Sequence, residues 1–156
     1  TTTSQKFMTD ADVIFSPPPK SLAERVSQGL GWLTRGRQTD DRAERLLYFF
    51  TAIEALLSND DKTAPVTQTI ARHAAVMLTN DNHNRSEIAA EIKALYAFRS
   101  ALVHAGSRSV SGSVANRTQN IAEALYMTAL EKADLKSSHE TFNNSLAKAS
   151  YGSTWP

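Results

Sequence analysis

The stretch 39–60, "TDDRAERLLYFFTAIEALLSND", has the strongest helical pattern in the chain. Thr39 or Asp40 is placed to cap a helix, and acidic residues occupy the first turn, where they interact favourably with the helix dipole. Apolar residues then recur up to Leu57, before the polar run "SNDDK" ends the pattern. We therefore predict an amphipathic helix over this stretch, with its apolar stripe turned towards a core.

Further helical patterns lie on both sides of this stretch, and no pair of segments is typical of a strand hairpin. Gly106 is placed to end one of them in the left-handed conformation, whereas glycines within residues 21–36 weaken another. The fold class predicted is therefore all-α, a helical bundle of about five to six helices. The additional predicted helices cover residues 21–36, 65–81, about 85–104, 116–135 and 139–150.

The first twenty residues differ from the rest because they end in "SPPPK", and consecutive prolines block a helix and favour extended backbone. We expect residues 1–20 to form an extended N-terminal arm, a short strand or the end of a preceding region. Residues 21–150 are expected to form one helical domain, and residues 151–156 a tail. Since the chain does not begin with Met, we expect either a processed chain or a piece of a longer protein with a domain upstream.

The composition limits the function classes. The net charge of +1 argues against a histone-like binder of nucleic acid, although it leaves room for a local basic site. The absence of cysteine excludes thiolate catalysis and Cys-based zinc sites, and suits a cytoplasmic protein. We expect no membrane contact, because no apolar run is long enough to span one. The four histidines lack ligand spacing, so we expect neither a metal nor another cofactor.

Arg99 is the most unusual residue of the predicted helix over 85–104. At about 100° per residue, it falls at the centre of an apolar stripe between Ile92 and Leu95. Glu54 occupies a similar place in the stripe of the helix over 39–60. Since an unpaired buried charge costs several kcal/mol, we expect these two residues to pair. The pair is interpreted either as a core ion pair that fixes helix register, or as an acid that orients Arg99 towards an anionic ligand.

His104 lies about 140° from Arg99 on an ideal helix, among the alanines of the opposite side. Those small residues allow another helix to approach closely, and a second copy of the protein is one candidate for that helix. A histidine in the last turn is more often a helix cap than a catalyst, because the carbonyl dipoles stabilise its protonated form.

Together, "RLLYFFTAIEALLS" and "YAFRSALVHAG" resemble the HEPN superfamily, and within it the Apea-like branch. The matching signature is Arg99, the polar Ser100 and His104, with the acid Glu54 in an earlier helix. The resemblance covers about residues 40–135. It implies a helical bundle that forms a homodimer, with the Arg and His of two subunits in one cleft. It further implies a metal-independent endoribonuclease of a defence or toxin-type system, with Arg99 and His104 catalytic, Glu54 and Ser100 supporting, and an antitoxin or other regulatory partner.

The chemistry suits these residue types. Attack of a ribose 2′-OH on the adjacent phosphate needs a base, an acid and a cation that holds phosphate oxygens. His104 can move protons near neutral pH, and Arg99 can hold phosphate in a bidentate fork. The alternative is a non-catalytic module that binds nucleotide, RNA or protein, in which Arg99 and Glu54 form only a core ion pair.

Three further arginines are candidate RNA-binding residues. Arg108 and Arg117 lie in or near the Gly/Ser-rich loop after His104, where they are placed to contact RNA phosphates. Arg72, with the adjacent His73, is a candidate for a basic cleft. For each of them a solvated surface residue is the competing interpretation.

Overall fold

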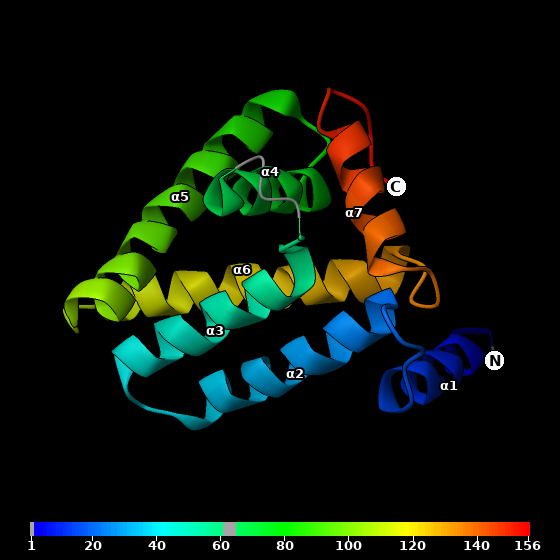
Figure 1. Ribbon diagram of the computed structural model, residues 1–156, viewed down its shortest axis with the longest axis horizontal. Coiled ribbons are helices and arrows are strands. Elements are labelled where there is room, and N and C mark those ends of the chain that lie inside the picture. The colour runs from blue at the N-terminus through cyan, green and yellow to red at the C-terminus, as the bar shows by residue number, and fades with distance from the viewer. Residues whose placement is uncertain (1, 61–64) are drawn as a thin grey trace.

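The computed structural model describes residues 2–60 and 65–156 and is built, over these residues, from seven α-helices without a strand (Figure 1). This confirms the predicted all-α class. The count exceeds the predicted five to six because a helix also forms at the N-terminus. The helices are α1 (Thr2–Phe15), α2 (Leu22–Gln38), α3 (Arg42–Leu57), α4 (Val66–Leu78), α5 (Asn82–Ala105), α6 (Gly112–Lys132) and α7 (His139–Ala149).

Helix α3 is the centre of the core. It begins after Asp41, whose side chain accepts a hydrogen bond of 2.9 Å from the backbone N–H of Glu44. Helices α2 and α6 run along its two sides, and α4 and α5 cover it from above in Figure 1. A helix surrounded in this way needs apolar residues around most of its circumference. Those of α3 are fully buried: Leu46, Phe49, Phe50, Ile53, Leu56 and Leu57.

Two glycines of α2 allow this close packing, although they weaken the helix taken alone. A Cβ atom on Gly29 would lie 1.5 Å from the hydroxyl of Tyr126, which instead donates a hydrogen bond of 2.6 Å to the carbonyl of Ala52. A Cβ atom on Gly36 would lie 2.7 Å from the ring of Phe49. These glycines therefore let α2 pack directly on side chains of α3 and α6.

The expectation of an extended arm over residues 1–20 is wrong for residues 2–15, which form α1. The prolines act only on the residues beside them, so the helix ends before Pro17, and residues 2–15 contain no Gly or Pro to interrupt it. Val13 and Ile14 pack against the core, and Lys6 Nζ donates a hydrogen bond of 2.9 Å to the carbonyl of Leu130. The proline run therefore ends α1 and does not prevent it from forming.

Helix α5 starts three residues earlier than predicted and ends as predicted. Asp81 caps its N-terminus, and Gly106 ends it with a φ angle of 67°. After α7, the last residues fold back onto the helices: Trp155 is buried against Phe142, with 6.1 Å between the ring centres. No helix in the described part of the chain has the length and apolarity needed to cross a membrane.

Candidate functional site

Arg99 and Glu54 meet between α5 and α3, as their places on the two helices predict. Arg99 Nε lies 3.0 Å from Glu54 Oε1, and Arg99 Nη2 donates a long hydrogen bond of 3.4 Å to Oε2. The side chains are 19% and 25% exposed, so the pair lies at the border of the core rather than inside it. Such a position keeps the guanidinium within reach of a ligand.

The electrostatics of the pair are unbalanced. Burial raises the pKa of Glu54 above its usual range, and the attraction of Arg99 offsets this only in part. Arg99 Nε and Glu54 Oε1 are both shielded from solvent, and the angle between them is not that of a hydrogen bond. The Tyr96 ring also contacts the guanidinium, with 5.7 Å between the ring centre and Arg99 Cζ. Arg99 is therefore held by an acid and a ring, while its Nη1 has no hydrogen-bond partner in the described part of the chain.

His104 and Ser100 lie on the same helix but on other sides of it. His104 is exposed in the last turn, and Ser100 is partly exposed. The α-helix continues through Ala105, so Arg99 and His104 stand about 140° apart and about 7.5 Å apart along the axis. The last turn is not tightened, since Gly106 bonds back to the carbonyl of Ala101. A single chain thus directs the two side chains to different sides of α5.

The side of α5 that carries His104 is uncovered. Its alanines were expected to receive another helix, and none of the described residues provides one. Two large apolar side chains nearby also remain in solvent, Phe98 at 41% and Val103 at 48% exposure. The exposed small residues are Ala90, Ala94, Ala97 and Ala101. We call these four alanines the alanine face.

Two of the three candidate RNA-binding arginines are paired with acids. Arg108 Nη2 lies 2.8 Å from Asp41 Oδ1. Arg117 forms a bidentate ion pair with Glu91, in which Nη2 donates a hydrogen bond of 2.9 Å to Oε2. The hydrogen bond from Arg117 lowers the pKa of Glu91. Arg72 has no acidic partner within the part of the chain that the structure describes. It lies on α4, in a different part of the molecule, where it borders a depression together with residues of α5.

His73 does not contribute a charge to a basic cleft. It is only 1% exposed, and burial lowers its pKa to about 4, so the ring is neutral at physiological pH. His139 is also buried, and its Nε2 lies 2.7 Å from the carbonyl of Leu56. Among the described residues, no group of three or more acidic or histidine side chains is arranged to hold a metal ion.

The sequence analysis missed two cationic residues of α5. Arg85 is buried at 7% exposure and binds four acceptors, and Lys93 borders the same depression as Arg72. Arg85 was treated only as the start of a helix. A helical wheel extended back to Arg85 places this residue about 40° from Arg99, on the buried side of the helix. That position could have identified Arg85 as a buried cation from the sequence. Comparisons of the chain with family models, with curated proteins and with solved structures find no match.

Proposed function

We propose that the protein is a metal-independent endoribonuclease in which Arg99 and His104 act on one phosphate. The observation that carries the proposal is the state of Arg99. It is held by Glu54 and Tyr96 yet remains partly exposed, its Nη1 has no hydrogen-bond partner among the described residues, and it lies on the same helix as the exposed His104. A preorganised cation and an imidazole that can accept and donate protons are the groups that phosphoryl transfer needs.

The proposed reaction forms one bond to phosphorus and breaks another. The ribose 2′-oxygen attacks phosphorus while a neutral His104 takes its proton. The bond to the 5′-oxygen breaks, and a protonated histidine donates the proton that the leaving oxygen needs. The products are a 2′,3′-cyclic phosphate and a 5′-hydroxyl. Arg99 stabilises the extra negative charge on the phosphate oxygens as the attack proceeds.

The proposal requires two copies of the chain, because one chain directs Arg99 and His104 to different sides of α5. The alanine face is the surface that we propose for this contact, since small side chains allow two helices to approach closely and its apolar residues are exposed. His104 lies on that face and would act on a phosphate held by Arg99 of the other subunit, so the second copy would have to meet this face with the side of its α5 that carries Arg99 and not with its own alanine face.

The proposal also rests on the resemblance to the HEPN superfamily. That resemblance implies a ribonuclease of a defence or toxin-type system. The accompanying proposals are a cytoplasmic location and an antitoxin or regulatory partner. Glu54 and Ser100 are supporting residues in this scheme, Glu54 because it orients Arg99. RNA contacts by Arg108 and Arg117 would require that they leave Asp41 and Glu91.

A second function class is favoured by a different observation. Arg99 Nε and Glu54 Oε1 are shielded from solvent, as in an ion pair that only fixes the register of α3 and α5. The protein would then be a non-catalytic module that binds nucleotide, RNA or protein. His104 distinguishes the two classes, because it is exposed and has no structural partner in the described part of the chain.

The test is RNA cleavage in EDTA by the unaltered protein and by His104→Ala. We expect His104→Ala to fold normally and to lose cleavage by about 10²-fold or more, as for loss of a general acid or base. The matched control is His83→Ala, which removes another exposed histidine of α5, 82% exposed, and should leave cleavage unchanged. Arg99→Ala is assayed beside them, with its unfolding temperature as a check.

Three results would count against the proposal. Cleavage that persists in His104→Ala would remove this residue from the reaction. A protein that cuts no RNA, together with an unfolded Arg99→Ala, would favour the core ion pair. A strictly monomeric protein in gel filtration could not form the shared cleft.

A further inference from the structure

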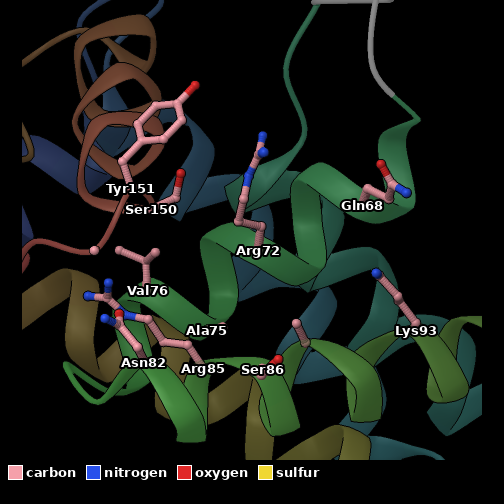
Figure 2. A pocket seen from close by; sticks show the side chains of 12 residues that line it. Gln68, Arg72, Ala75, Val76, Asn82, Arg85, Ser86, Lys93, Ser150 and Tyr151 are labelled. Carbon is pink, nitrogen blue, oxygen red and sulfur yellow. The ribbon is translucent and has the colours of Figure 1, made fainter.

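A depression that no acidic residue of the described chain lines lies between α4, the N-terminal half of α5 and the chain after α7 (Figure 2). Its volume of about 540 Å³ is within the range of sites for small ligands. Three cationic side chains border it, Arg72, Arg85 and Lys93. Its neutral polar residues add hydrogen-bond donors and acceptors: Gln68, Asn82, Ser86, Ser150 and Tyr151.

Arg85 carries a buried charge that no carboxylate of the described residues neutralises. Its acceptors are the carbonyls of Thr79, Ala149 and Ser153, at 2.9, 3.1 and 2.8 Å, and the side-chain oxygen of Asn80 at 3.5 Å. A guanidinium has five N–H donors, so one N–H on Nη1 remains unused. The carbonyls beside helix ends carry partial negative charge, which offsets only part of the cation. Arg85 therefore leaves positive charge at the wall of the depression.

The other two cations have no partner among the described residues. Arg72 and Lys93 form no ion pair or hydrogen bond there, and both side chains are exposed. The acids at the start of α5 and within it have other partners, since Asp81 caps the helix, Glu87 lies 3.4 Å from His83, and Glu91 pairs with Arg117. Figure 2 shows the three cations coming from two helices around the same depression. Three positive charges without an acid favour an anion.

We propose that this depression binds a phosphate group. Arg85, with its remaining N–H, forms the fixed wall of the site, and the long side chains of Arg72 and Lys93 close on the phosphate oxygens from the rim. Charge-assisted hydrogen bonds of this kind are shorter and stronger than neutral ones. The phosphate belongs either to a small phosphorylated molecule or to the backbone of RNA. This binding does not depend on the proposed cleavage, because none of the three cations takes part in it.

The test measures binding rather than activity, with two probes and backbone amide NMR shifts as the readout. Inorganic pyrophosphate represents a free phosphate compound. A 2′-O-methyl oligoribonucleotide represents RNA and cannot be cut by 2′-OH attack. Arg85 is left unaltered because it also joins three chain segments. The test variant is Arg72→Gln with Lys93→Gln. The matched control is Lys132→Gln with Lys136→Gln, which removes two exposed charges from the C-terminal end of α6 and the loop after it, outside the lining of the depression.

We expect a probe to shift the amides of Asn82, Ser86 and Gly152, and the test variant to weaken its binding about tenfold or more while the control does not. Saturation by pyrophosphate would identify a small phosphate compound as the occupant. Saturation by the oligonucleotide alone, with the same dependence on Arg72 and Lys93, would identify RNA. The proposal is overturned if neither probe shifts these amides, or if the control variant weakens binding as much as the test variant.

Discussion

Helix α5 carries two arginines on nearly the same side, and their surroundings differ. Arg99 meets a carboxylate, that of Glu54, and remains 19% exposed. Arg85 lies deeper, at 7% exposure, and meets only neutral oxygen atoms from α7, the last residues of the chain and the turn before α5. The two arginines therefore serve different purposes. Arg99 is held in place by an acid at a partly exposed position, whereas Arg85 joins segments of the chain through hydrogen bonds to their carbonyls.

Replacing Arg85 should have the largest effect. Arg85→Met removes four hydrogen bonds and leaves buried carbonyls without donors, so we expect a loss of about 3 kcal/mol in the free energy of unfolding. Chemical denaturation measures this loss. The control is Arg35→Met, since Arg35 is exposed and only stacks on Trp32, 5.0 Å from the ring centre. Equal costs for the two variants would show that Arg85 does not fasten the chain.

Arg99→Met should cost less, about 2 kcal/mol at pH 7, because Glu54 keeps part of its contact with water. Changing Glu54→Gln in the same protein should recover part of that loss, since no unpaired carboxylate then remains. A double-mutant cycle by denaturation should give a coupling of about 1 kcal/mol. Additive effects would contradict a direct interaction between the two side chains.

The pH dependence of stability should be smaller, and its sign tests the balance at Glu54. Because burial raises the pKa of Glu54 in the folded state, the folded state binds a proton more readily than the unfolded state. The contribution of this group is therefore complete below the unfolded value of 4.5 and is lost as pH rises through the folded pKa.

Unfolding of the unaltered protein and of Glu54→Gln, measured from pH 4 to pH 7, should show the unaltered protein losing stability relative to the variant. The cost of Arg99→Met should likewise shrink towards pH 4, where Glu54 becomes neutral. A difference that runs the other way would mean that Arg99 outweighs burial at Glu54.

The smallest effect is expected for a surface ion pair between α5 and α6. Arg117→Ala breaks the ion pair with Glu91, whose side chains are 49% and 36% exposed, and should cost about 0.5 kcal/mol or less. Thermal unfolding at low and high salt measures it, and salt should reduce the difference further. A loss of stability as large as that of Arg99→Met would show that the half-buried pair at the border of the core is worth no more than this exposed pair.

The sequence predicted most of the helices because their signals are local. The caps, the apolar spacing and Gly106 all act within a few residues, so α3 and the end of α5 lie close to the predicted positions. The pairing of Arg99 with Glu54 was also predictable, since each is a charge within an apolar stripe and needs a partner. The assignment of α1 was wrong because a strong proline signal was extended over residues that it does not touch.

The sequence by itself thus determined that the chain is all-α, where its main helices run, and that two misplaced charges belong together. Only the tertiary structure decided that Arg85 is a buried cation without an acid, because its acceptors come from segments up to 68 positions away. It also decided that the alanine face is uncovered and that Arg72 and Lys93 share one depression. Helical periodicity states which residues share a side of a helix, whereas the packing of other elements determines what that side meets.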